Sequence, residues 1–333
     1  MQVLDGIRGL AVLIVLASHT SAFGMHGQGS LGVLLFFFLS GYVLTIPYAR
    51  NPARLFSKKE LFRFSINRIL RIVPIYIVAV LFIAWLADVN FNWILAHITF
   101  YKGWNHLWSV AQEARFYLLF PFVVAIWAFL PNSILRILAT LILIYLSYLF
   151  RNEIKIDMLD GRFVSFYFWY FLGGMLACML YFSKGMARFA HNSLVKNTLV
   201  IASIFILYFV LFSSDHMIYT FWRPIFNDLP TEFKLNGWRI PHVWFFLFLL
   251  LLYTLTTYSE SKPARFIQWY FFRHIGLLSY SLYLFHMPVF LQLRQFGFKN
   301  EGMFFAVLGI SYVFAVLSYL LVEKPFLSLK IKR

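Results

Sequence analysis

The sequence is poor in cysteine and in charged residues. It has one cysteine, Cys178, which excludes an internal disulfide, so nothing in the fold depends on an oxidising compartment. Only 13% of the 333 residues are charged, whereas 61% are hydrophobic, and the mean hydropathy is +0.75. A soluble domain of this length is not so apolar. The composition therefore predicts a protein that crosses a membrane several times.

The sequence also lacks repeats and linkers that would divide it into domains, and it lacks a cleavable signal peptide. We find no repeat with a period of about 20–50 residues and no low-complexity linker. A basic segment followed by a cleavage motif is missing at the N-terminus, so we expect the first apolar run to be retained. Residues 1–333 are therefore predicted to form a single transmembrane domain, and no appended soluble domain is expected.

Apolar runs long enough to cross a bilayer as helices recur along the chain. They predict an all-α, polytopic protein with about ten transmembrane helices, which lie at residues 4–22, 31–49, 70–88, 111–130, 134–150, 163–182, 197–213, 241–258, 275–293 and 303–322. An even number of crossings places both termini on the same side of the membrane.

The basic residues predict which side that is. The chain has 29 Lys and Arg against 13 Asp and Glu, and most of the basic residues lie on the side of the termini, above all in the predicted loop 50–71. Because basic loops stay in the cytoplasm, both termini are predicted to be cytoplasmic. These charges are scattered over short loops, so a nucleic-acid partner is not expected.

The first apolar run, "LDGIRGLAVLIVLASHT", contains three costly polar residues, Asp5, Arg8 and His19. Arg8 and His19 are eleven residues apart, so on a helix they share one face and lie about 16 Å apart along the axis. An arginine at the centre of a bilayer costs about 2.5–3.5 kcal/mol or more, which predicts a hydrated cavity or a partner. Gly6 and Gly9 would let another helix or a ligand approach closely. The alternative is that Arg8 extends to the headgroups while His19 caps the helix.

Six stretches, in register over nearly the whole chain, resemble acyltransferase family 3. They are "LDGIRGLAVLIVLASHT" with ten residues between Arg and His, "GVLLFFFLSGY", "NRILRIVPIY", "LWSVAQEARFYLLFP", "LSYSLYLFHMPV" and "VEKP". Leu34 lies where the family often has an acidic or polar residue, so this position is not expected to supply a ligand. Ala114 and Arg115 replace a commoner Glu-Gln pair, which leaves Glu113 alone. We expect no hydrolase-like domain after the tenth run, so a second transfer step would need another protein.

The resemblance implies a membrane O-acyltransferase, usually an O-acetyltransferase, of the bacterial cytoplasmic membrane. The donor would be cytoplasmic acyl-CoA, usually acetyl-CoA, used as a substrate and not as a permanently bound cofactor. The acceptor would be a hydroxyl of an extracytoplasmic carbohydrate, such as the O-antigen of lipopolysaccharide or a capsule. Transfer would take place in a central pore between the helices.

Arginines that could bind the phosphates of the donor lie on or next to two predicted helices. Arg68 and Arg71 are one helical turn apart and are therefore neighbours. Guanidinium groups form bidentate bonds with phosphates, so these two residues and Arg8 are expected to hold the nucleotide end of CoA. The alternative is that the pair anchors the cytoplasmic end of a span.

The expected catalytic residues are His19 and Glu113. An imidazole suits proton transfer near neutral pH, so His19 is predicted to be the base that takes the hydroxyl proton. Glu113 is expected to orient His19 or to bind the sugar, and Tyr117 shares its helix face. Glu113 could instead pair with Arg115 or cap its helix.

Aromatic and histidine side chains are candidates for acceptor binding. We expect Tyr117, Trp108, His286 and Trp222 to contact the acceptor. Trp222 lies in the longest predicted external loop and could instead belong to an aromatic belt at the membrane surface. His286 could equally be a buried histidine between helices. The other histidines lack metal-ligand spacing, and no metal site is predicted.

Two alternatives concern the reaction itself. A transporter or flippase of a lipid-linked or acylated sugar would show Gly- or Pro-broken spans at matching places in two halves, and the sequence lacks this symmetry. Direct attack of the acceptor is the simpler route. Cys178 has no histidine nearby and Ser40 lacks a nucleophile-elbow context, whereas an acyl-histidine intermediate stays open.

Overall fold

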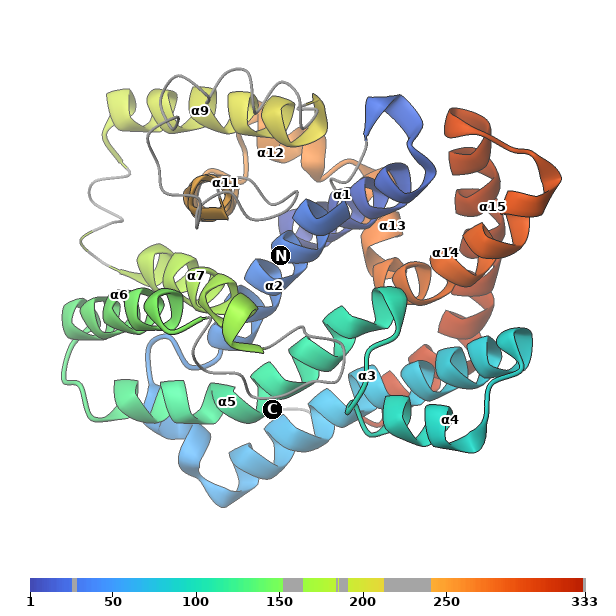
Figure 1. Cartoon of the computed structure of the whole chain (residues 1–333). Coiled ribbons are helices and arrows are strands. Elements are labelled where there is room, and N and C mark those ends of the chain that lie inside the picture. The colour runs from blue at the N-terminus through green and yellow to red at the C-terminus, as the bar shows by residue number, and fades with distance from the viewer. Residues whose placement is uncertain (26–28, 152–163, 184, 186–190, 213–240, 332–333) are drawn as a thin grey trace.

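The structure is a computed structural model that describes residues 1–25, 29–151, 164–183, 185, 191–212 and 241–331. Every regular element among these residues is helical, which confirms the all-α prediction. The helices are α1 (Gln2–Thr20), α2 (Gly29–Thr45), α3 (Lys58–Ala87), α4 (Phe91–Ile98), α5 (Trp108–Ala128), α6 (Ser133–Leu149), α7 (Val164–Phe182), α9 (Ser193–Phe212), α11 (Pro241–Thr257), α12 (Lys262–Ile267), α13 (Tyr270–Leu277), α14 (Ser279–Leu293), α15 (Asn300–Ser318) and α16 (Lys324–Ser328) (Figure 1).

Several of these helices can span a membrane. Five are long and apolar enough, and the pair α13 and α14 makes a sixth if this bent unit is counted as one span. Shorter apolar helices lie in the other predicted runs, including α2, α6 and α9. The protein is therefore a multi-pass membrane protein. The count of ten crossings and the cytoplasmic termini stay predictions.

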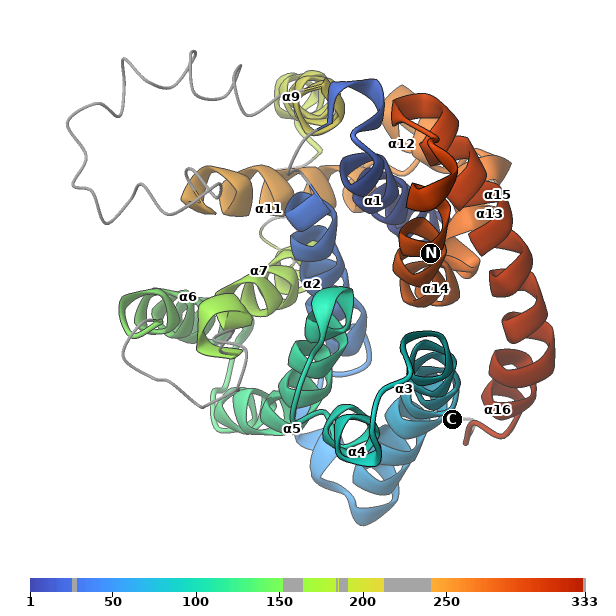
Figure 2. The ribbon, with the colours of Figure 1, turned by 45° about the vertical axis from the view of Figure 1, so that its right-hand side comes forward.

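Helix α1 is the innermost of the membrane-spanning candidates. In its most apolar 18-residue window 72% of the residues are buried, compared with 22% in the window that includes α15. It packs against α2 on one side and against α13, α14 and α15 on the other (Figure 2). Helix α2 in turn packs against α7. The first helix of the chain thus lies beside the last ones, and residues distant in sequence become neighbours.

Glycine permits the closest of these contacts. A Cβ atom added to Gly9 would lie 2.0 Å from the carbonyl oxygen of Phe272, and one added to Gly276 would lie 1.8 Å from that of Asp5. The backbones of α1 and α13 therefore touch at these two positions. This confirms the prediction that the glycines beside Arg8 admit another helix, and it is typical of membrane helix packing.

The structure corrects two predicted boundaries. Residues 58–71 are helical, not part of a loop, because α3 begins at Lys58. The Ser57 side chain accepts a hydrogen bond from the Glu60 backbone N–H and caps the N-terminus of α3. The predicted span 275–293 is not one straight helix, since Leu278 leaves the helical conformation with ψ near 1° and α13 meets α14 at 75°.

We predict that Gly276→Ala destabilises the bundle, because the added methyl group collides with a backbone carbonyl that cannot move aside independently. Overpacking of this kind costs about 1–3 kcal/mol. The measurement is the unfolding temperature of the purified protein in detergent. Gly309→Ala on α15 is the matched control, because a Cβ there meets no atom within 4 Å. Equal unfolding temperatures for the two variants would contradict the packing described here.

Candidate active site

A cavity in the middle of the bundle collects three arginines. We call it the arginine cavity, and its volume is about 70 Å³. Arg8 of α1 lines it together with Arg68 and Arg71, which lie three to four turns inside α3. Helices α2, α5 and α14 complete its wall. These further lining residues include Ser40, Ser109, Glu113, Tyr117, Ser279, Tyr280 and Tyr283.

Acidic groups neutralise the charge of this cavity only in part. Arg8 has an acidic partner, Asp5, at 3.4 Å between Nη1 and Oδ1. Arg68 and Arg71 form no ion pair with any residue that the structure describes, and the Nε atom of Arg68 is buried without a hydrogen-bond partner. The guanidinium of Arg68 lies over the Tyr117 ring, 5.8 Å from its centroid. Positive groups held this way favour an anionic ligand.

Glu113 belongs to the arginine cavity. Its carboxylate accepts hydrogen bonds from the hydroxyl of Tyr117, at 2.6 Å, and from the hydroxyl of Ser40 on α2. Because α5 begins at Trp108, Glu113 lies in the second turn of the helix and not at its start. Arg115 turns away and donates to the carbonyl oxygen of Phe100. The ion pair between Glu113 and Arg115 that the sequence left open does not form.

His19 lines a second, larger cavity of about 410 Å³, which we call the histidine cavity. Its wall also contains His106, Trp108 and Tyr167. Val33 and Tyr283 line both cavities, so the two spaces adjoin at these residues. A continuous pore through the bundle would have to pass Val33 and Tyr283. The pore stays a prediction.

Three imidazole rings meet beside the histidine cavity. The ring centroid of His286 lies 5.3 Å from that of His19 and 5.1 Å from that of His106. A carbonyl oxygen can only accept, so Nδ1 of His286 donates to Tyr283 at 2.6 Å and Nε2 of His106 donates to Leu284 at 2.9 Å. The opposite nitrogen of each ring is buried without a partner. Each therefore presents a free lone pair in the interior.

Tyr283 ties this group to α5. Its hydroxyl donates to the backbone carbonyl of His106 at 2.6 Å and accepts from Ser109 at 2.7 Å. Ser109 and Tyr283 are buried. The wall between the two cavities is therefore held by hydrogen bonds as well as by apolar packing.

The structure brings most of the predicted residues together, but in two groups. Arg8, Arg68, Arg71, Glu113 and Tyr117 line the arginine cavity, whereas His19 and Trp108 line the histidine cavity. The expected contact of Glu113 with His19 is therefore not formed.

The remaining predicted residues are placed differently. His286 is completely buried behind His19 and lines neither cavity, and Trp222 lies outside the described residues. Sequence reasoning missed His106 and the hydroxyl of Ser40. His106 directly precedes the motif "LWS", and Ser40 lies within the motif "FFFLSGY". These positions in or next to family motifs were the sequence signal that could have identified both residues.

Known proteins resemble the chain in sequence. The chain is 26% identical to the O-acetyltransferase OatA of Staphylococcus aureus over 97% of its length, and 26% identical to the peptidoglycan O-acetyltransferase OatA of Listeria monocytogenes, also over 97%. It spans about half the length of these relatives, 56% and 55%. No solved structure matches the chain. The sequence model of acyltransferase family 3, described as an acyltransferase domain, matches residues 1–323, and the chain therefore belongs to this family.

Proposed function

We propose that the protein is a membrane O-acetyltransferase that moves an acetyl group from acetyl-CoA to a hydroxyl of a cell-envelope glycan. The observation that carries the proposal is the shared wall of the two cavities. A site that suits an anion and a site that holds a histidine meet at Val33 and Tyr283. The printed names of the relatives support acetyl transfer, and peptidoglycan is the first acceptor to test.

The donor would bind with its phosphates in the arginine cavity. Arg8, Arg68 and Arg71 would form charge-assisted hydrogen bonds to them. The flexible arm of CoA would then extend toward His19, which lies about 16 Å from Arg8 along the axis of α1. In this position the thioester carbonyl would lie at the wall between the cavities.

The acceptor would enter the histidine cavity. Its hydroxyl oxygen attacks the thioester carbonyl carbon while His19 takes the hydroxyl proton. The new C–O bond forms, the C–S bond breaks, and the imidazolium of His19 returns the proton to the CoA sulfur. The aromatic faces of Trp108 and Tyr167 would pack on the sugar ring. His286 would support the His19 ring from behind and not bind the acceptor directly.

Glu113 would act on the donor side. Its carboxylate holds the Tyr117 hydroxyl, and the ring of Tyr117 lies under the guanidinium of Arg68. This chain of contacts positions Arg68 for a phosphate group. Glu113 is then a positioning residue for the donor, and it does not orient the base.

We predict that His19→Ala abolishes acetyl transfer but leaves donor binding intact, because the base is removed while the arginine cavity is unchanged. General-base catalysis contributes about 10²–10⁴-fold. The measurements are turnover and equilibrium binding of radiolabelled acetyl-CoA with purified protein. His191→Ala, at an exposed histidine, is the control. Substantial turnover by the His19 variant would refute the assignment.

We predict that Arg71→Ala weakens acetyl-CoA binding, because one charge-assisted contact to phosphate is lost. Such a contact contributes about 1.5–3 kcal/mol, which corresponds to a KM for acetyl-CoA that is roughly 10–100-fold higher. Arg265→Ala serves as the control, since Arg265 is 69% exposed and pairs with Glu260 on the surface. An unchanged KM in the Arg71 variant would exclude this residue from the donor site.

We predict that Val33→Phe blocks transfer without weakening donor binding, because the larger ring fills the wall where the two cavities meet. Misplacement of the thioester by about 1 Å can cost roughly 100-fold in rate. Val33→Ala is the matched control and should remain active. Full activity of the phenylalanine variant, with its unfolding temperature unchanged, would show that the acetyl group does not pass this wall.

A further inference from the structure

The chain after α16 returns to α3 and is tied to it. The side-chain amide of Asn67 donates to the carbonyl oxygen of Ile331 at 3.1 Å, and the Ile331 backbone N–H donates to the Asn67 side-chain oxygen at 3.0 Å. Helix α16 also packs along α3. Two reciprocal hydrogen bonds fix both the position and the orientation of the backbone at residue 331.

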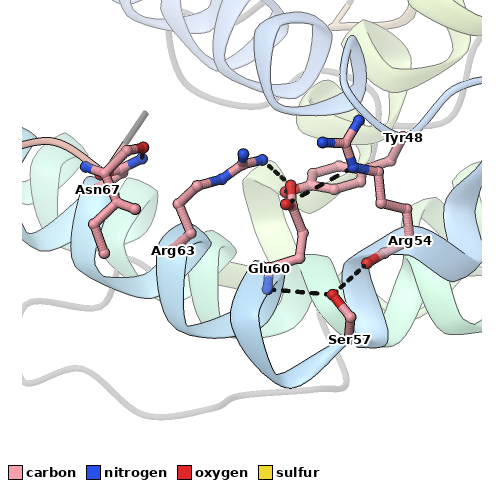
Figure 3. A network of polar contacts seen from close by, with 7 residues as sticks. Tyr48, Arg54, Ser57, Glu60, Arg63 and Asn67 are labelled. Carbon is pink, nitrogen blue, oxygen red and sulfur yellow. Dashed lines mark hydrogen bonds and ion pairs between the residues drawn. The ribbon is translucent and has the colours of Figure 1, made fainter. Parts of the chain in front are cut away.

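A neighbouring cation on the same helix is already paired with a carboxylate, which it shares with Arg54. Arg63 donates to Glu60 in a buried ion pair, and Glu60 also accepts from the hydroxyl of Tyr48 at 3.1 Å. Figure 3 shows the Arg63 side chain turned toward Glu60. Its charge is therefore not free for a ligand, in contrast to Arg68 and Arg71.

The attachment point lies at the level of the arginine cavity. Asn67 directly precedes Arg68, and it lies one helical turn before Arg71 on the same face of α3. Ile331 lines a cavity of about 160 Å³ together with Arg68, and this cavity borders the arginine cavity through that residue. The segment that ends at Ile331 thus forms part of the surroundings of the three arginines.

Lys330 is the charged residue that this attachment brings in. It is half-buried and directly precedes Ile331. Burial, together with the positive charges of Arg71, Arg68 and Arg8, lowers the pKa of Lys330 to about 8, while Glu323 opposes this effect. Four cations from three distant segments repel one another, and an anion with several charges would relieve that repulsion.

We propose that Lys330 is a fourth cation of the donor site and binds a phosphate group of the acyl-CoA. The inference rests on the proposed function and extends its donor site to a residue outside the family motifs. The class of ligand is a thioester linked to a nucleotide through a diphosphate, because a ligand with several phosphate charges matches four clustered cations. Asn67 is the positioning residue that holds Lys330 there.

The test compares the kinetics of three variants. Lys330→Ala should raise the KM for acetyl-CoA by about tenfold, the effect of one lost charged contact, with kcat nearly unchanged. Lys330→Arg should restore a KM near that of the wild type, and Lys324→Ala, at an exposed lysine six residues earlier, should not change it. With acetyl-pantetheine, which lacks the nucleotide, the wild type and Lys330→Ala should have the same KM.

The pH dependence of the KM for acetyl-CoA distinguishes a ligand role of Lys330 from a purely structural one, because a structural role would not change it. As the pH rises through about 8 the ammonium of Lys330 loses its charge, so the KM of the wild type for acetyl-CoA should rise between about pH 7 and pH 9. The guanidinium in Lys330→Arg stays charged over this range, and its KM should change less. Asn67→Ala should raise the KM in the same direction as Lys330→Ala.

Two outcomes separate failure of this inference from failure of the proposed function. If the wild type is saturated by acetyl-CoA and Lys330→Ala has the same KM, Lys330 is not a donor ligand. If the wild type does not use acetyl-CoA, the proposed function fails, and binding of inorganic pyrophosphate is measured by its effect on the unfolding temperature. A smaller shift in Lys330→Ala than in the wild type supports the cation site, and an equal shift overturns it.

Discussion

Moving a guanidinium group into hydrocarbon costs about 2.5–3.5 kcal/mol or more, and this cost organises the centre of the molecule. Arg8 lies on the most deeply buried membrane-spanning helix, and two further arginines face it from α3. Such a group can persist in an apolar bundle only if polar walls and a cavity surround it. The serine and tyrosine hydroxyls of the arginine cavity supply those walls. The same arrangement leaves positive charge unneutralised and makes the cavity suitable for an anion.

Close helix packing determines which residues of α14 lie beside the two cavities. Contact between α1 and α13 at Gly9 and Gly276 brings the end of the chain against its beginning. The bend at Leu278 then directs α14 across α1, so that Tyr283 reaches the wall between the cavities and His286 reaches the ring of His19. Under the proposed function, this geometry places donor binding and proton transfer in two adjoining cavities.

Some of the site followed from periodicity along a single helix. The spacing of Arg8 and His19 predicted a shared face, the spacing of Arg68 and Arg71 predicted neighbouring guanidinium groups, and each of these residues lines a cavity. Contacts between helices could not be predicted in this way. Glu113 was expected to orient His19 or to bind the sugar, and the register of α5 against α2 places its carboxylate on Ser40. The start of α3 was also predicted too late, because its first turns are charged and do not resemble an apolar span.

The sequence by itself determined that the protein is an apolar helical bundle of the membrane, that it belongs to acyltransferase family 3, and which arginines and which histidine lie on inward faces. These follow from composition, motif order and helical periodicity, which are local properties of the chain. The tertiary structure alone decided that the polar residues form two cavities with a shared wall, that the His286 ring lies beside both His19 and His106, and that the backbone next to Lys330 is tied to Asn67, the residue before Arg68. These features depend on how helices that are far apart in the sequence cross and align with one another. Tertiary packing determines that alignment, and no local sequence pattern predicts it.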